Sequence, residues 1–345
     1  MRRYDLDWLR VLVLGLLIIY HSTISFMPFG IKLFFPQNKQ TLDILWFVMG
    51  LINIWRIPLL FIISGMAVCF SMKRRNWKEM FKDRALRIVV PYMFGLFVIC
   101  PISLLLQSIF YDAEISYIPN PGHLWFLNNI WMYFCCLIVL FVYLHKTPNN
   151  LLLIFLKKVF TYPLGIYIMA ILFVIEGIFI TPDSYASYAY TIHGWVLGLV
   201  CFLTGYIFIL LNENFWDAVL RVKHISLMIA FLLYLVRAFL FEFVGFHPLT
   251  AIESFSWMIS IFGYGAKFLN KKSTRLSYLS TAVYPIYILH MPLQFFFSLF
   301  IIPWHIPAML KLILIIMSTL ISSFMIYDLI IKRLKWIRPL FGLKI

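Results

Sequence analysis

Three residues near the start of the chain have types and spacing that suit acid–base chemistry. Asp7 and Arg10 are three positions apart, which puts a carboxylate and a guanidinium on one face of a helix, where they can pair. His21 follows Arg10 by eleven positions, so it points to nearly the same side, about 16 Å further along the axis. Taken alone, a structural hydrogen bond explains His21 and a charge reaching the surface explains Arg10. Together they predict a base and an anion-binding group on one stripe.

A second histidine strengthens the chemical interpretation. His290 lies about 13 residues, or about 20 Å, into a helix expected from residue 277, and His21 lies about as deep in its own helix. Pro285 and Pro292 bracket His290 and free backbone groups, which is tolerated where helices line a cavity. A histidine titrates near neutral pH and can act as a general base. We therefore expect the two histidines to share a depth in the molecule.

A pair of arginines at another helix offers a site for phosphate. Arg84 and Arg87 are three positions apart and so share a face. The planar guanidinium makes fork-like contacts with phosphate oxygens. The alternative is that both are charges that set topology or bind lipid headgroups.

The remaining ionisable residues predict a polar region in the other half of the membrane. Charges at membrane depth are costly, so each is a candidate site residue. Any one of them is also explained as a salt-bridge partner, and an aromatic at this level as an interface anchor. As candidate substrate-binding residues we take Arg56, His123, Trp125, Glu176, Arg237 and Glu253.

The elements that must position these residues are membrane-spanning helices. Of 345 residues, 63% are hydrophobic and only 12% are charged, which is too few to cover a soluble protein. Stretches of about 20 apolar residues, enough to cross a bilayer, recur along the chain. We predict an all-α, polytopic integral membrane protein, one transmembrane domain over residues 1–345 without a separate soluble domain, and about ten helices at 8–28, 44–71, 87–108, 123–144, 160–180, 190–211, 224–241, 248–268, 277–301 and 306–331.

The charge of the connections predicts the orientation. The termini and alternate loops carry 24 lysines and arginines, whereas the other loops carry only Lys32 and Lys39. Positive loops stay in the cytoplasm, so both termini are expected there. The net charge of +15 is thus a topology signal, and no soluble basic domain supports nucleic-acid binding. The five cysteines lie in apolar spans, with no spacing that suits a metal or a disulfide framework.

Several segments in order resemble the acyltransferase-3 family of bacterial envelope O-acyltransferases. They are the Asp7–Arg10 opening with His21, the run 58–65, Arg84 to Pro91, the run 122–127, and the run 284–292 around His290. The opening and the run 55–59 are most similar to the branch that includes the glucan biosynthesis succinyltransferase. The resemblance implies a bacterial inner-membrane enzyme that moves an acyl group, acetyl or succinyl, from cytoplasmic acyl-CoA to a carbohydrate hydroxyl.

On this resemblance Arg10, Arg84 and Arg87 would hold the phosphates of acyl-CoA. His21 would be the general base or a transient acyl acceptor, and His290 would orient the acceptor or stabilise an oxyanion. Membrane lipids and a carbohydrate acceptor are the expected partners, and no metal is expected.

Two other functions remain open from the sequence. A transporter or flippase for a glycan or lipid-linked sugar would also need a polar midplane and broken helices, although no repeated half is visible. A non-catalytic scaffold would gain nothing from buried histidines and arginines. The acyl group, the acceptor, and whether the protein forms a homo-oligomer or needs a partner protein are also open.

Overall fold

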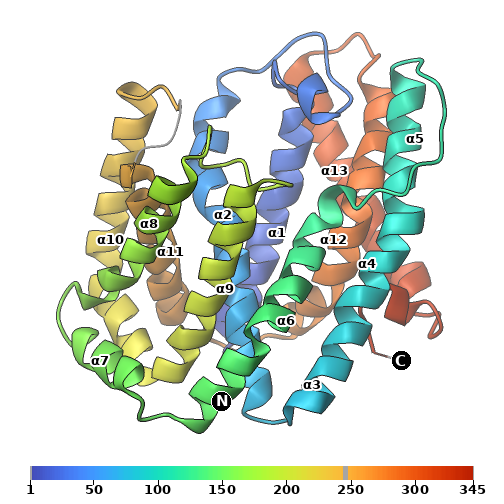
Figure 1. Ribbon diagram of the computed structural model, residues 1–345. Helices are drawn as coiled ribbons and strands as arrows, with labels where there is room; N and C mark the ends of the chain where they lie inside the picture. Colours follow the sequence, from blue (N-terminus) through green and yellow to red (C-terminus); the bar gives the residue numbers. More distant parts are fainter. Residues whose placement is uncertain (1, 244–247, 345) are drawn as a thin grey trace. The chain divides into compact units, whose positions relative to one another are not determined.

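The computed structural model describes residues 2–243 and 248–344, and those residues form helices and connections without strands. Figure 1 shows the helices. They are α1 (Tyr4–Ile24), α2 (Leu45–Met72), α3 (Trp77–Arg84), α4 (Val90–Phe94), α5 (Cys100–Phe110), α6 (Trp125–Lys146), α7 (Leu151–Val159), α8 (Ala170–Ile180), α9 (Ile192–Leu211), α10 (Glu213–Phe239), α11 (Pro248–Phe268), α12 (Thr274–Ile301) and α13 (Ala308–Ile326).

Each of the ten expected helices has a counterpart, and eight helical segments in the described residues are long and apolar enough to cross a membrane. α11 falls outside those eight because it carries buried polar residues, Glu253 among them, that lower its hydropathy. α3 to α5 form one helical segment from residue 77 to residue 110, with π-helical turns at Ala85–Val89 and Gly95–Ile99. The apolar multi-pass helices make this a membrane protein.

Three boundaries differ from those predicted. The helix expected from 224 begins at Glu213, and the helix expected from 87 begins at Trp77. Polar residues can extend a helix beyond the apolar run, so hydropathy alone underestimates its length. The short α7, with Asn150 as a side-chain N-cap, lies where we expected a loop, and the helix expected from 160 begins as a 3-10 turn at Gly165.

The described contacts divide the chain into two compact units. Unit 1 contains Met1–Arg10, Gly50–Lys82 and Asn129–Lys272, and unit 2 contains Val11–Met49, Asp83–Asn128 and Ser273–Ile345. Both α1 and α2 contribute residues to each unit. The two units are described separately below.

In unit 1, α10 packs against α11, which also packs against α8 (Figure 1). Tyr167, in the 3-10 turn Gly165–Met169 before α8, makes hydrogen bonds of 3.0 Å through its hydroxyl to Ser226 of α10 and to Ser256 of α11. Glycines bring α2 and α9 together: a Cβ at Gly65 would overlap the Phe202 carbonyl oxygen, and a Cβ at Gly205 would overlap the Ile62 carbonyl oxygen. Small residues that allow close backbone approach are typical of membrane helix pairs.

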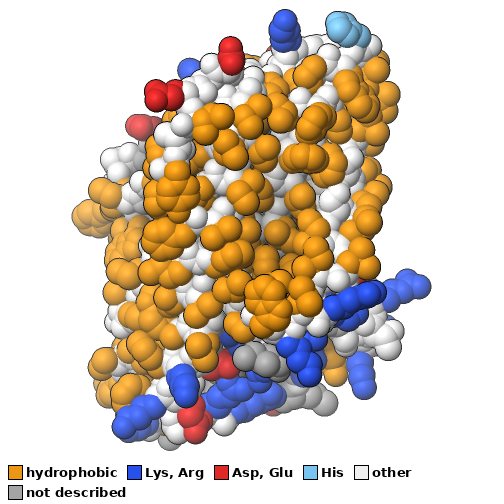
Figure 2. Space-filling model, turned by 90° about the vertical axis from the view of Figure 1, so that its right-hand side faces the viewer, with side chains coloured by type: hydrophobic (Ala, Val, Ile, Leu, Met, Phe, Trp, Pro, Cys, Tyr) orange, Lys and Arg blue, Asp and Glu red, His pale blue; other side chains and the backbone are white. Residues whose placement is uncertain are grey.

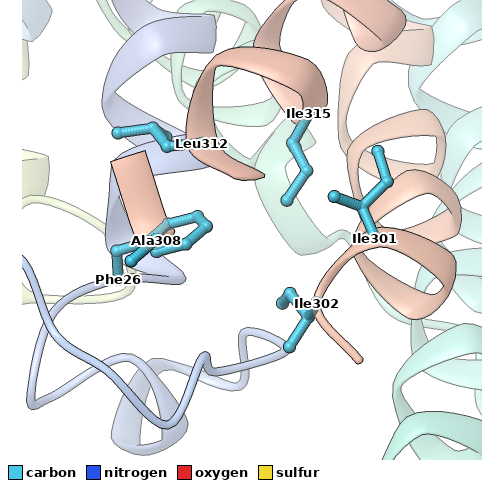
Figure 3. Packing of buried hydrophobic residues seen from close by; sticks show 6 residues of the cluster. All are labelled: Phe26, Ile301, Ile302, Ala308, Leu312 and Ile315. Carbon is cyan, nitrogen blue, oxygen red and sulfur yellow. The ribbon is translucent and has the colours of Figure 1, made fainter. Parts of the chain in front are cut away.

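In unit 2, α12 packs between α13 and α5. The end of the unit near the α12–α13 turn is closed by an apolar cluster that Figure 3 shows, made of Phe26, Ile301, Ile302, Ala308, Leu312 and Ile315. Figure 2 looks onto the side where Figure 1 shows α5 and α13. Hydrophobic side chains cover that face and lysines and arginines gather toward its lower edge, as expected of a lipid-facing surface with a charged margin.

Prolines inside the helices leave carbonyl groups that side chains from other segments capture. A proline has no N–H, so the carbonyl four residues earlier loses its helical partner. In unit 1, Pro58 frees the Ile54 carbonyl, which accepts from the Tyr188 hydroxyl at 2.8 Å and the Ser254 hydroxyl at 2.7 Å. In unit 2, Pro91 frees the Arg87 carbonyl, which accepts from the Tyr284 hydroxyl. Pro101 frees the Phe97 carbonyl, which accepts from the Tyr117 hydroxyl. Pro292 frees the Ile288 carbonyl, which accepts from Nε2 of His123.

Candidate active site

The two histidines predicted to share a depth are in direct contact in unit 2. His21 on α1 and His290 on α12 lie with Nδ1 of His21 3.0 Å from Nε2 of His290. Their rings are nearly parallel, with an interplanar angle of 12° and centroids 5.2 Å apart. The His290 side chain is fully buried, whereas His21 is partly exposed. Of the two side chains, His21 is therefore the one that is partly accessible.

Hydrogen-bond chemistry assigns the protons of this pair. Nδ1 of His290 lies 2.7 Å from the carbonyl oxygen of Tyr287, and a carbonyl only accepts, so Nδ1 carries a proton. Both rings lie within membrane-spanning segments, where a charge is costly, so we treat them as neutral. Nε2 of His290 then accepts from Nδ1–H of His21, which leaves the lone pair of His21 on its Nε2. The arrangement orients His21 as a proton acceptor, with a backbone carbonyl at the end of the chain.

A third histidine fixes the end of that chain. His123, in the 3-10 turn Gly122–Leu124, donates from Nε2 to the carbonyl oxygens of Tyr287 at 3.1 Å and Ile288 at 3.2 Å. In return, the Tyr287 hydroxyl donates to the His123 carbonyl at 2.6 Å. The Ile288 carbonyl is available because Pro292 cannot donate to it. His123 was predicted to bind substrate, and the structure places it as a buried support of α12 beside His290.

The connection after α1 covers the histidine pair. The Phe35 ring, which is buried, lies 5.9 Å from the His21 ring and 5.3 Å from that of Phe295. Tyr111 holds this connection by donating to the Phe35 carbonyl at 2.7 Å. Burial raises the pKa of the Tyr111 hydroxyl, which therefore keeps the proton that it donates. Access to His21 from this side requires the connection to move.

Gln294 lies one turn beyond His290 on α12 and contacts the His21 backbone. Its amide nitrogen is 3.4 Å from the His21 carbonyl and 3.2 Å from the Ser25 hydroxyl. Its amide oxygen is buried and has no hydrogen-bond partner in the described part of the chain. An unfilled acceptor thus lies beside the histidine pair.

The two arginines predicted to bind phosphate are also in unit 2. Arg87 lies in the first π-helical turn, its side chain is 41% exposed, and its Nε is 3.2 Å from a carboxylate oxygen of Asp83. The Arg87 carbonyl accepts from Tyr284, which precedes His290 by six residues, or about 9 Å of helix. Arg84 lies one turn before Arg87. Trp125, which was predicted to bind substrate, is the first residue of α6. An exposed, weakly paired arginine can exchange its partner for a phosphate.

Arg10 lies in unit 1 with its expected partner. Its Nη1 is 3.8 Å from a carboxylate oxygen of Asp7, which is also bound by Arg2 at 2.8 Å. A second nitrogen of Arg10 lies 3.5 Å from the Ile63 carbonyl.

Two of the predicted substrate-binding residues form an ion pair in unit 1. Arg237 on α10 binds Glu253 on α11 through two hydrogen bonds of 2.7 Å and 3.0 Å and also donates to the Gly50 carbonyl at 2.9 Å. The Glu253 side chain is fully buried. Such a bidentate pair satisfies both charges within the protein.

Glu176 pairs with a histidine in the same unit. Nδ1 of His193 lies 2.8 Å from a Glu176 carboxylate oxygen, and Nε2 of His193 donates to the Tyr185 carbonyl at 3.0 Å. Arg56, on α2 just before Pro58, is buried in unit 1 as well. The binding role predicted for these residues stays a prediction.

Comparison with known proteins identifies the family. The sequence model of the acyltransferase-3 family, described as an acyltransferase domain, matches residues 3–328. The chain belongs to the acyltransferase-3 family. Family membership supports a membrane acyltransferase. Searches of curated proteins and of solved structures found no match.

Three features of this acyltransferase escaped the sequence analysis. The Tyr287 carbonyl that orients His290 is a backbone group and has no sequence signature. Gln294 could have been found as the residue one turn beyond His290 on the same helix face. The third feature is Lys311, whose side chain is buried in the structure. The sequence signal for it was a charged residue inside the helix expected at 306–331.

Proposed function

We propose that this acyltransferase moves an acyl group from acyl-CoA to a hydroxyl of an envelope carbohydrate, with His21 as the general base. The observation that carries the proposal is the chain from His21 through His290 to the Tyr287 carbonyl. Enzymes activate weak nucleophiles with a base that a second side chain orients by a hydrogen bond. Here His21 is the base, His290 orients it, and the Tyr287 carbonyl in turn orients His290.

The reaction follows from the assigned protons. Nε2 of His21 takes the proton of the sugar hydroxyl while the oxygen of that hydroxyl attacks the thioester carbonyl carbon. The carbon–sulfur bond then breaks, and the departing CoA thiolate receives the proton back from Nε2. Nδ1–H of His21 stays hydrogen bonded to His290 throughout, which stabilises the charge on the His21 ring. His290, whose two nitrogens both have partners in the protein, acts by orienting His21.

We propose that Arg87, supported by Arg84, contacts the phosphates of acyl-CoA. Arg87 is half-exposed, and its backbone is held by Tyr284 about 9 Å along α12 from His290. The narrow pantetheine arm of CoA would extend from Arg87 toward His21. The basic charge of the termini and alternate loops supports a cytoplasmic side for Arg84 and Arg87, which is where a cytoplasmic acyl-CoA would bind. The Gln294 amide oxygen is a suitable acceptor for a hydroxyl of the incoming sugar.

The test is acyl transfer by the purified protein in lipid vesicles. Radiolabelled acetyl-CoA and succinyl-CoA are supplied separately with a panel of envelope glycans. The His21→Ala variant is measured beside the wild type, and His224→Ala, at a histidine that hydrogen bonds Tyr264 outside unit 2, serves as the matched control. We expect label in a glycan with wild type and with the control, and none with His21→Ala.

Two results would contradict the proposal. Full transfer by His21→Ala, with folding verified by its thermal unfolding midpoint, would exclude His21 as the base. Translocation of unmodified glycan across the vesicle, without binding or hydrolysis of any acyl-CoA, would favour the transporter alternative.

A further inference from the structure

A lysine is buried at the end of unit 2 near the histidine pair. Lys311, in the first turn of α13, is 9% exposed. Its ammonium donates to the Ile302 carbonyl at 2.6 Å and to the Asn38 amide oxygen at 3.1 Å. Both acceptors are neutral, and no described carboxylate forms an ion pair with Lys311. A buried charge is ordinarily paired with an opposite charge, so this cation lacks the partner expected of it.

The lysine also has donor capacity to spare. An ammonium has three N–H groups, and the described residues accept two of them. The apolar cluster of unit 2, which includes Ile302 and Leu312, surrounds this end of α13, as Figure 3 shows. Water is therefore a poor substitute for a counter-charge.

Hydrogen bonds connect Lys311 to the proposed base. Asn38, which binds the ammonium, donates its backbone N–H to the Ser25 carbonyl at 2.8 Å. The Ser25 hydroxyl accepts from the Gln294 amide, which also contacts the His21 carbonyl. Ser25 is four residues after His21, so the lysine site begins about one helical turn from the base. A substituent that extends from a substrate at His21 past Ser25 and Asn38 would reach Lys311.

We propose that Lys311 binds an anionic substituent of a substrate, a carboxylate on the acyl group or an acidic group on the carbohydrate. This inference rests on the proposed function for the identity of the substrate. An anion would supply the missing counter-charge and accept the third N–H of the ammonium. Such charge-assisted hydrogen bonds are among the stronger ones in proteins. Lys311 would therefore decide which substrates are accepted, while His21 performs the transfer.

The test compares Lys311→Met, which keeps the length and apolar stem, with Lys311→Arg, which keeps the charge. Lys39→Met is the matched control, because Lys39 is exposed and adjacent to Asn38. Acyl transfer is measured with acetyl-CoA and succinyl-CoA on a neutral glycan, and with acetyl-CoA on a phosphorylated glycan. Lys311→Met loses a charged hydrogen bond to the substrate, so we expect its kcat/KM to drop by about ten- to a hundred-fold for the anionic substrate alone.

The pairs of substrates distinguish the source of the anion. A selective loss with succinyl-CoA assigns the site to the acyl group, and a selective loss with the phosphorylated glycan assigns it to the carbohydrate. An equal loss with every substrate, or no loss, overturns the inference and leaves Lys311 as a structural clamp.

A binding measurement separates this inference from the proposed function. The thermal unfolding midpoint is recorded with succinate, with inorganic phosphate and with uncharged succinamide. We expect an anion to raise the midpoint of the wild type and of Lys39→Met, but not that of Lys311→Met. If the anion raises the midpoint of Lys311→Met as much as that of the wild type, or raises neither, the anion site is overturned whether or not transfer is observed. A wild type that binds the anion but transfers no acyl group contradicts only the proposed function.

Discussion

Replacing His290 tests whether it acts by orienting His21. His290→Leu removes the acceptor of the His21 Nδ1–H bond, which is 3.0 Å long and partly buried. His290→Gln places an amide oxygen where Nε2 stood and keeps an acceptor for the same proton. We therefore expect His21 to keep its orientation in the second variant and to lose it in the first.

The expected loss of kcat follows from what the His21–His290 hydrogen bond does, which is to position the base and to fix its tautomer. A correctly placed base contributes about 10²–10⁴ to the rate, and loss of the group that fixes its tautomer can remove about as much. His290→Leu should thus lower kcat by about 10²–10⁴ with little change in the KM for acyl-CoA, since His290 is not among the residues proposed to contact CoA. The His21 Nδ1–H would then face an apolar side chain without an acceptor, which should also reduce the free energy of unfolding by about 1–3 kcal/mol.

The assay is single-turnover acyl transfer in vesicles, alongside thermal unfolding of each variant. His290→Gln should recover a large part of kcat, whereas a purely structural role predicts that activity follows stability alone. Undiminished kcat in His290→Leu, or a Gln variant as inactive as the Leu variant at equal stability, would refute the orienting role.

Three further predictions concern features of the fold. Glu253→Leu leaves Arg237 buried without its carboxylate and should cost about 3–5 kcal/mol of unfolding free energy, with the double variant that also carries Arg237→Met recovering much of it in denaturant titrations. Gly65→Val should destabilise unit 1 by about 1–3 kcal/mol, because its side chain overlaps a carbonyl of α9, and an unchanged midpoint would contradict that packing. Pro292→Ala restores an N–H that competes with His123 for the Ile288 carbonyl, and it should lower kcat more than it lowers stability.

The helices and their order were predictable because lipid imposes a simple rule on sequence. A span must be apolar for about 20 residues, and that requirement is visible without knowledge of packing. The boundaries were less predictable where polar residues extend a helix beyond its apolar run, as at Glu213 and Trp77. α11 illustrates the opposite case, since its polar residues are buried against neighbouring helices within unit 1.

The shared depth of His21 and His290 was predictable from residue counts, whereas their direct contact was not. Both residues lie at a similar distance from the start of their predicted helices, and helical rise converts that count into depth. The pairing of Arg237 with Glu253 was not predictable, because rotation of one helix against another decides which charges meet. The same holds for His123, whose acceptor exists only because of Pro292 on another helix.

The carbonyl groups freed by prolines have a consequence for how the protein is made. The Ile54 carbonyl in α2 accepts from Tyr188 and Ser254, which are 134 and 200 residues further along the chain. The Arg87 carbonyl accepts from Tyr284, 197 residues later. During synthesis the ribosome delivers these early helices long before their partners, and lipid offers no substitute donor. Each early helix therefore stays incompletely satisfied until late helices arrive, so a chain released prematurely carries polar defects in its first spans that mark it as unfinished.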